Sequence, residues 1–339
     1  MRSAFARFLG YDPSMMRNGR RPMGRTDWIL LVALSLLWGG SFFFFKVLVA
    51  ELPPFTIVFG RVALASAALL AFVYATGRRM PADPRVWGAF AVMGLLNNVI
   101  PFALIAWGER EISSGLASIL NATTPIFTVL FASALTKDER LTPSRLGGVL
   151  LGILGVAVLI GPEAIRGLNL ASAAQLAVVG AAVLYGLANI FGRRFGALGL
   201  SPIVTATGQV CSSSLIAFPL MLAIDRPWSF AHAPSLAAIA SLAGIAILCT
   251  AVAYALFFRI LASAGPTNVS LVTFLVPLSA LLLGIGLLHE RLAWTSVAGM
   301  AVIFTGLALI DGRLFARRTP QPAAPAVGTC PPAPAPQRK

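Results

Sequence analysis

The stretch Glu139-Arg140-Leu141 recurs 151 residues later as Glu290-Arg291-Leu292, and the residues around it recur with it. The matched residues are Phe102-Ala103-Leu104 with Tyr254-Ala255-Leu256, Pro125 with Pro277, Gly148 with Gly299, Gly155 with Gly306, Trp38-Gly39 with Tyr185-Gly186, Lys46 with Arg193, Pro54 with Pro202, and Arg61 with Gln209. A duplicated membrane unit is typical of transporters, because two copies that rock against each other can open one binding site to either side of the membrane in turn.

The composition predicts a protein that lies in lipid. The chain of 339 residues is 58% hydrophobic and 11% charged, with a mean hydropathy of +0.84. A single water-soluble core cannot bury that much apolar surface. We therefore expect an all-α integral membrane protein.

Ten apolar stretches are long enough to cross a bilayer as helices, which takes about 17 to 25 residues. They are Trp28–Leu48, Phe55–Thr76, Trp87–Trp107, Gly115–Thr136, Pro143–Gly161, Ala173–Phe191, Ile203–Ile224, Leu236–Phe258, Thr267–Leu288 and Trp294–Ile310. Five fall in each copy of the repeat, residues 28–161 and 172–311. Because five is odd, the second copy enters the membrane inverted, so the fold class expected is ten transmembrane helices in two inverted five-helix repeats.

The basic residues set the orientation. The formal net charge is +14, but 20 of the 26 Lys and Arg residues lie in the loops and ends of one side and four on the other. This asymmetry follows the positive-inside rule and places both termini in the cytoplasm. It excludes the basic surface of a nucleic-acid-binding protein.

The two ends carry no predicted span. Residues 1–27 are rich in Arg and form either a cytoplasmic basic arm, which we favour, or an organelle transit peptide. No small-residue cleavage site follows the first apolar run. Residues 319–339 are mostly Pro and Ala and predict a disordered cytoplasmic tail.

No metal or cofactor motif is recognisable. The cysteines, Cys211, Cys249 and Cys330, lack the spacing of metal ligands. His232 and His289 fall in predicted loops, and His289-Glu290 lacks the second His of a helical zinc site. We expect no metal, no cofactor and no catalytic residues.

The order of the motifs resembles a known family. Leu37-Trp38-Gly39-Gly40-Ser41 leading to Lys46, then Leu52-Pro53-Pro54 and Arg61, is similar to the opening of EamA-type members of the drug/metabolite transporter superfamily. The Pro, Glu-Arg-Leu and Gly-rich series at the end of each repeat resembles it too. The resemblance covers about residues 28–310. It implies an inner-membrane permease, with export as one direction, that moves small metabolites such as amino acids or analogues through a central cavity.

Two prolines indicate where the site lies. Pro125 and Pro277 fall inside the fourth and ninth spans, and each leaves the carbonyl four residues earlier without its helical donor. Those carbonyls belong to Asn121 and Thr273. Matching interruptions in both halves point to a substrate site, although prolines also kink helices that simply pack tightly. Thr124 and Asn268 add polar side chains to the same spans.

Polar residues at similar depth in other spans complete the candidate substrate-binding set: Trp38, Asn97, Asn98, Tyr185, Asn189, Gln209 and Tyr254. Neighbours on a helix lie about 100° apart, so Asn97 and Asn98 cannot share one face. One of them faces the cavity or both bond neighbouring helices.

Lys46 and Arg61 are the charged residues inside predicted spans. A charge at mid-membrane costs about 3 kcal/mol on insertion scales. Lys46 lies near a span end, where it can reach the headgroups. Arg61 lies deeper, and we expect it either to attract a substrate carboxylate or to lock helices by bonding backbone carbonyls.

All 12 acidic residues lie in loops or at span ends. No carboxylate is therefore available for a proton relay at mid-membrane. The sequence favours uniport or weak proton coupling, in which Glu109, Glu111 or backbone oxygens would take part.

Three functions compete on the sequence alone. A permease fits the duplication best. A membrane scaffold or sensor would use the basic arm and the tail, and an intramembrane enzyme would need a base that the spans lack. The partners expected are a small-molecule substrate and the lipid bilayer. Oligomeric state, substrate identity, flux direction and coupling ion are not encoded in a recognisable motif.

Overall fold

The computed structural model describes residues 24–135, 142–160, 170–230, 232–264, 269 and 271–311. These ranges are helical, with short π and 3-10 segments, and contain no strand. The prediction of an all-α protein is confirmed for them. Asn268, the basic arm up to residue 23, the first Glu-Arg-Leu stretch and the Pro/Ala-rich tail lie outside the described residues.

The first half of the chain forms five consecutive helical rods, some of them in segments. Their bounds are α3 Arg25–Leu48; α4 Pro54–Ala75; α5 Pro84–Gly94 with π-segment η1 Leu95–Val99 and α6 Ile100–Gly108; α7 Ser114–Asn121 with α8 Thr124–Leu135; and α9 Pro143–Ile160. Proline opens α4 and α5, where its missing N–H costs no hydrogen bond. The side chains of Asp83 and Ser113 cap α5 and α7.

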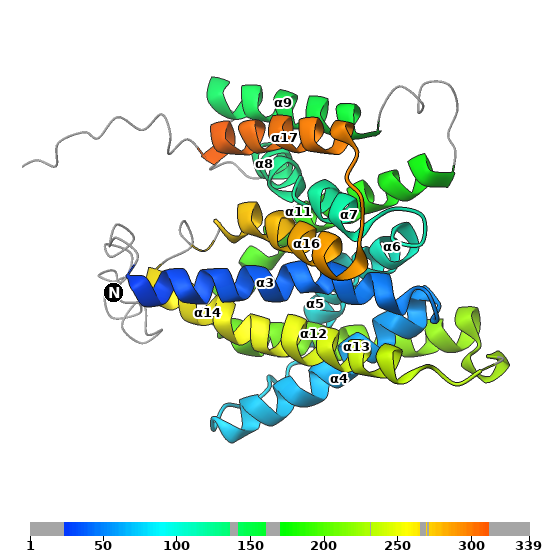
Figure 1. Cartoon of the computed structure of the whole chain (residues 1–339). Coiled ribbons are helices and arrows are strands. Elements are labelled where there is room, and N and C mark those ends of the chain that lie inside the picture. The colour runs from blue at the N-terminus through cyan, green and yellow to red at the C-terminus, as the bar shows by residue number, and fades with distance from the viewer. Residues whose placement is uncertain are drawn as a thin grey trace, which may run out of the picture.

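The second half repeats this order. Its elements are α11 Leu170–Ala197; α12 Pro202–Leu220 with η2 Met221–Asp225; the 3-10 turn η3 Pro227–Ser229; α13 Leu236–Ala246 with η4 Ile247–Val252 and α14 Ala253–Ala264; α16 Val272–Leu288; and α17 Trp294–Asp311. Figure 1 shows α9 and α17 as a pair at the edge of the bundle.

Among the described residues, seven helices are long and apolar enough to cross a membrane: Arg25–Leu48, Pro54–Ala75, Pro84–Gly108, Ser114–Leu135, Leu170–Ala197, Pro202–Ser229 and Leu236–Phe257. Three shorter apolar helices lie in α9, α16 and α17. Large apolar side chains are exposed on the outside of the bundle, among them Leu215 at 73% and Leu282 at 71%. Water would oppose such a surface, whereas lipid accepts it, so the chain is an integral membrane protein.

The helix contacts come in matching pairs. α3 packs on α16, as α11 packs on α7 and α8. α3 also contacts α14 and α11 contacts α6, while α13 packs on α4 and α5 packs on α12. α4 with α12, and α9 with α17, pair across the two halves.

Glycines permit the closest of these contacts. A Cβ added at Gly39 would lie 2.6 Å from the Ser279 Cβ, and one added at Gly186 would lie 2.8 Å from the Phe127 Cβ. The two contacts correspond in the repeat, because Gly186 follows Gly39 by 147 residues and Ser279 follows Phe127 by 152 residues. Small residues let membrane helices approach closely enough for backbone packing.

Gly148 provides a test of this packing. Its added Cβ would lie 2.5 Å from the carbonyl oxygen of Gly306 on α17. Since backbone atoms cannot move aside cheaply, Gly148→Ala should destabilise the protein by about 1–3 kcal/mol. The measurement is thermal unfolding in detergent, followed by tryptophan fluorescence.

The neighbouring glycine is the control. An added Cβ at Gly147 meets no atom within 4 Å. Gly147→Ala should therefore leave the melting temperature nearly unchanged. Equal losses in the two variants would show that the α9–α17 contact is looser than the structure has it.

Candidate functional site

A cavity of about 920 Å³ lies inside the helix bundle, with walls from both halves of the chain. Most of the residues singled out from the sequence line it: Trp38, Arg61, Asn97, Asn121, Thr124, Tyr185, Asn189, Gln209, Tyr254, Thr273 and Pro277. Aromatic and apolar side chains make up much of the remaining wall, including Phe42, Phe45, Phe102 and Phe257. The lining is thus largely apolar with a few convergent polar groups, as in many small-molecule sites.

Three of the singled-out residues do not line the described cavity. Asn98 is 1% exposed and points away from it, donating from Nδ2 to the Ser213 hydroxyl at 2.9 Å. Pro125 sits in the first turn of α8, next to the lining residue Thr124, but is not itself in the wall. Asn268 lies outside the described residues.

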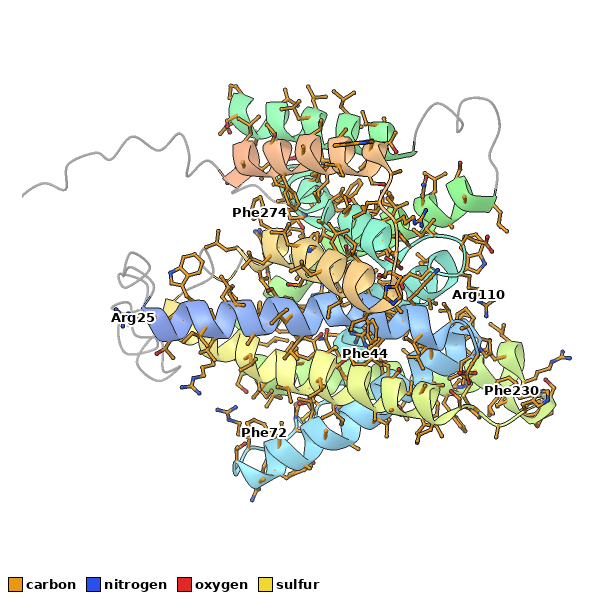
Figure 2. The ribbon with its side chains drawn as sticks, viewed as in Figure 1. Arg25, Phe44, Phe72, Arg110, Phe230 and Phe274 are labelled. Carbon is orange, nitrogen blue, oxygen red and sulfur yellow. The ribbon has the colours of Figure 1, made fainter. Side chains whose placement is uncertain are left out.

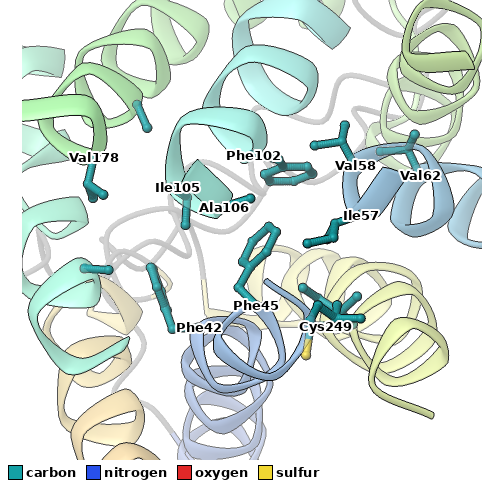
Figure 3. Close-up of a cluster of buried hydrophobic side chains, with 14 of the residues drawn as sticks. Phe42, Phe45, Ile57, Val58, Val62, Phe102, Ile105, Ala106, Val178 and Cys249 are labelled. Atoms are coloured by element: carbon teal, nitrogen blue, oxygen red, sulfur yellow. The ribbon is translucent and has the colours of Figure 1, made fainter. Parts of the chain in front are cut away.

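Arg61 is the charged side chain of the buried wall. It is 5% exposed, and its Nε donates to the Thr250 hydroxyl at 3.1 Å. Its guanidinium carbon lies 3.8 Å from the ring centroid of Phe102 and 5.2 Å from that of Phe45. Figure 3 shows these two rings next to each other, and their planes are tilted by 60°.

No carboxylate of the described residues pairs with Arg61. The aromatic faces stabilise its charge through cation–π contacts. The guanidinium carries five N–H donors, and one of them is used in the bond to Thr250. Arg61 therefore retains donors and a positive charge for an anionic group that enters the cavity.

A short chain of hydrogen bonds also lies in the cavity wall. Asn97 Nδ2 donates to Gln209 Oε1 at 3.3 Å, and Gln209 Nε2 donates to the Tyr254 hydroxyl at 3.0 Å. Asn97 belongs to the first half of the chain and the other two to the second half. The chain of bonds therefore ties the halves together at the cavity.

The two proline helices differ. Before Pro125 the helix is broken, with α7 ending at Asn121 and α8 beginning at Thr124, whereas α16 runs unbroken through Pro277. The Asn121 carbonyl accepts a bond from the Thr124 hydroxyl at 2.8 Å. The side-chain oxygen of Asn121 is buried without a hydrogen-bond partner in the described part of the chain. It is an acceptor that a ligand in the cavity can use.

The π-segments are a feature that the sequence did not reveal. η1 (Leu95–Val99) and η4 (Ile247–Val252) interrupt corresponding helices at an offset of 152 residues. Asn97 lies in the first and Thr250 in the second. π-segments inside α-helices are rare and frequent at functional sites. Here they turn side chains toward Gln209 and Arg61, which occupy matching positions on α12 and α4.

The cavity reaches the surface at one end of the bundle. Arg193, Gly196 and Pro202 line it and are exposed. Ala174, near the start of α11, packs on Gly108. Arg193 lies 19 residues further along α11, or about 28 Å at 1.5 Å per residue. It is therefore at the end of the bundle opposite Gly108. That is the end where α3 starts, and we name it the Arg25 end. Toward the other end, named the Leu48 end, the lining residues Phe45, Ile105 and Ser118 are buried.

Three carboxylates bond the two halves of the chain to each other at the Leu48 end, each at the N-terminus of a helix from the other half. Glu51 accepts from the Ser235 N–H at 2.8 Å and hydroxyl at 2.6 Å. Asp225 accepts from the Thr56 N–H and hydroxyl at 2.5 and 2.9 Å. We call these contacts, with that of Glu290 described next, the Leu48-end latch. Figure 2 shows Arg110 and Phe230 at this end and Arg25 at the opposite one.

Glu290 makes the third contact of the latch. It accepts from the Ser114 N–H at 2.8 Å, the Ser114 hydroxyl at 2.9 Å and the Gly115 N–H at 3.2 Å. Carboxylates at helix N-termini satisfy free N–H groups and favour the helix dipole. Hydrogen bonds from Ser235 also hold the pKa of Glu51 below its ordinary value, so its contact persists at neutral pH and weakens as the pH falls through that lowered value.

Lys46 closes a helix end beside the latch. Its Nζ donates to the carbonyl oxygens of Glu109 at 2.6 Å and Ile112 at 2.8 Å. These carbonyls follow the last turn of α6 and have no intrahelical donor. Lys46 therefore stabilises the turn between α6 and α7.

An apolar helix bundle with an internal cavity that reaches the surface at one end has the architecture of a membrane transport protein. The model of the EamA-like transporter family matches residues 27–161 and 172–311, and the chain belongs to this family. The resemblance noted in the sequence is confirmed.

Known proteins of similar length support this assignment. The chain is 28% identical to the "Probable amino-acid metabolite efflux pump" of Escherichia coli (strain K12), over 84% of this chain and 94% of that relative. It is 24% identical to the "Uncharacterized inner membrane transporter YedA" of the same strain, over 83% and 89%. A crystal structure with 19% identity matches the fold with a TM-score of 0.61, over 86% of this chain and 99% of the other.

Proposed function

We propose that this chain is a ten-helix permease of the bacterial inner membrane that exports small metabolites such as amino acids or their analogues. In this proposal the three shorter apolar helices span the membrane with the seven longer ones, and both termini are cytoplasmic. Residues 28–161 and 172–311 form inverted five-helix repeats that give the central cavity alternating access to the two sides.

The paired contacts support the inverted repeats. Helix packing, a close glycine contact and the π-segment η1, which η4 matches, each recur in the second half at offsets of 147 to 152 residues. A non-duplicated bundle has no physical reason to repeat all three. The proposal of alternating access rests on one observation above all, which is that the cavity reaches the surface at the Arg25 end and is latched at the Leu48 end.

The cavity also supports the substrate class. Its volume of about 920 Å³ falls within the range of about 300–1,000 Å³ of small-molecule sites. Arg61 supplies a positive charge for a carboxylate, Asn121 a free acceptor for an ammonium group, and the aromatic wall a surface for an apolar side chain. A relative is named for the efflux of amino-acid metabolites. Its name supports the direction proposed here.

Counterflow in proteoliposomes tests the function. The purified protein should exchange at least one radiolabelled amino acid in a saturable manner. Thr273→Trp, which fills the cavity from α16, should abolish exchange, whereas Leu282→Trp on the same helix, where the native side chain is 71% exposed, should not. No exchange of any amino acid by well-folded protein, or equal effects of the two substitutions, would reject the proposal.

Thiol labelling tests the inverted arrangement. With the native cysteines replaced, Arg78→Cys and Arg226→Cys should react with a membrane-impermeant reagent from opposite sides. Arg78 follows α4 and Arg226 follows η2, at opposite ends of the bundle. If both cysteines react from one side, the arrangement is wrong.

The two adjacent asparagines should respond differently to alanine. Asn97→Ala removes a lining amide and should raise the KM for the substrate several-fold, because one neutral hydrogen bond contributes about 0.5–1.5 kcal/mol. Asn98→Ala leaves the cavity intact and should lower the melting temperature instead, since it removes the buried hydrogen bond between Asn98 and the Ser213 hydroxyl. Transport and unfolding measurements on both variants check this. A larger KM change in Asn98→Ala would contradict it.

The competing functions gain no support. The described cavity lining contains no histidine and no carboxylate that could serve as a catalytic base. A scaffold or sensor would not need a cavity with convergent polar groups that reaches one end of the bundle.

A further inference from the structure

Glu109 differs from the other carboxylates at the Leu48 end. It follows the last residue of α6, is 0% exposed, and neither side-chain oxygen has a hydrogen-bond partner in the described part of the chain. Glu51, Asp225 and Glu290 each accept at least two hydrogen bonds there. Glu109 has none, so hydrogen bonds do not explain why a carboxyl group is buried at this point.

Two charged groups face Glu109 from other elements. Lys46 on α3 lies beside it but donates to main-chain carbonyls, including that of Glu109 itself. Glu290, which follows α16, is the second, and its oxygens bond Ser114 and Gly115.

The other elements packed against Glu109 add little charge. Residues 170–178 of α11, which cover Gly108, include no ionisable side chain. Arg61, the charged residue of α4, touches Phe102, seven residues and about 10 Å of helix away. In the same turn, Arg110 and Glu111 are exposed.

These surroundings favour the neutral acid over the carboxylate. Burying a charge without a bonded partner costs far more than burying a neutral group. Burial raises the pKa of Glu109 well above its ordinary value; the Lys46 ammonium opposes the shift, and the Glu290 carboxylate adds to it. The closed arrangement of this end therefore favours the protonated form of the side chain.

We infer that Glu109 is a proton-binding site of the Leu48-end gate, which holds a proton while the latch is closed and releases it to water when that end opens. This inference rests on the alternating access proposed above. It adds a coupling between proton binding and the conformation of the gate, at a residue outside the substrate cavity.

The sign of the coupling follows from linkage. The proton is bound more tightly in the closed state than in the open, hydrated one. Protonation therefore stabilises the closed state fully at a pH below the open-state pKa, and this stabilisation is lost as the pH rises through the closed-state pKa. Between those two values the closed-to-open ratio should fall up to tenfold per pH unit, because one proton is exchanged.

Infrared spectroscopy of the protein in lipid nanodiscs tests the proton directly. At neutral pH the spectrum should show the C=O stretching band of a protonated carboxyl group. The isosteric variant Glu109→Gln should lose this band, and Glu111→Gln, two residues on and exposed, should keep it. Absence of the band in the native protein, or its persistence in Glu109→Gln, would overturn the inference.

A second variant guards against misfolding of the first. Glu290→Gln removes the neighbouring negative charge, so the band should disappear at a lower pH than in the native protein. An unchanged or higher titration pH would count against a proton on Glu109.

The gate response can be followed without transport. In a cysteine-free background, Leu52→Cys, whose native side chain is 5% exposed at the Leu48 end, should be labelled faster as the pH rises. The same rate is measured in the protein that also carries Glu109→Gln. Dividing the first rate by the second cancels the intrinsic pH dependence of the thiol. The ratio of the two rates should increase several-fold per pH unit. A constant ratio rejects the coupling. A protein that transports amino acids but lacks the Glu109 band keeps the proposed function and loses this inference.

Discussion

Arg61→Gln should lower the transport of carboxylate-bearing substrates about 10- to 100-fold and leave an analogue with an amide in place of the carboxylate nearly unaffected. A hydrogen bond to a charged group contributes about 1.5–3 kcal/mol, and 1.4 kcal/mol is tenfold in affinity. Arg61 is buried among Phe45 and Phe102, with no carboxylate of the described chain to occupy it. Glutamine already occupies the matching position of the other repeat, Gln209, so the site tolerates its size. Competition between the paired substrates in proteoliposomes provides the measurement.

The alternative role of Arg61 is to lock helices, and its bond to Thr250 gives that role a structural basis. Thr250→Val separates the two, because it removes the bond and keeps the guanidinium. If Arg61 binds carboxylates, Thr250→Val should retain the preference for them. If Arg61 only locks helices, Arg61→Gln should lower transport of both substrates equally and reduce the melting temperature. Arg61→Lys should recover part of the preference, since it keeps the charge and loses the planar fork.

Helix positions could be predicted well because lipid leaves an apolar chain few alternatives to the helix. The span predicted at Phe55–Thr76, for example, is α4 at Pro54–Ala75. The ninth span was predicted from Thr267, which lies outside the described residues; the described helix α16 begins at Val272, after a turn at Leu271.

The polar part of the cavity wall could also be predicted, because polar groups at mid-depth need a partner or a cavity. The aromatic part could not. Phe45 and Phe102 look like lipid-facing residues in the sequence, and only the fold places them against Arg61. The π-segments were equally hidden, since η1 and η4 carry no proline or glycine within them.

Long-range contacts explain the remaining differences. Lys46 was expected at the headgroups or in a structural role, and it binds carbonyls more than 60 residues away. Glu109 was predicted to be a loop residue because it follows an apolar run, yet its side chain is completely buried beside Lys46 of α3. Such burial depends on which helices meet, and sequence periodicity does not specify that.

Glu290→Gln should open the Leu48 end and increase the labelling rate of a cysteine at Leu52 about 10- to 100-fold. The Glu290 carboxylate accepts three bonds from Ser114 and Gly115 at the start of α7, across the two halves of the chain. Glutamine loses the charge and replaces one acceptor oxygen with a donor that faces the N–H groups of the helix. Losing even one charge-assisted bond, about 1.5–3 kcal/mol, shifts a two-state equilibrium by roughly this factor.

Ser114→Ala should also increase the labelling rate, but by less, because it removes only the hydroxyl donor and leaves both N–H donors in place. Glu111→Gln, at the same end but exposed, should leave the labelling rate unchanged. The order of the labelling rates matters more than their values. If Glu290 latches this end by bonding the N-terminus of α7, the rate should be highest in Glu290→Gln, lower in Ser114→Ala and lowest in Glu111→Gln. Labelling that is equal in all three variants would mean that the buried layer of Leu48, Leu52 and Ile112 closes this end without help from the carboxylate.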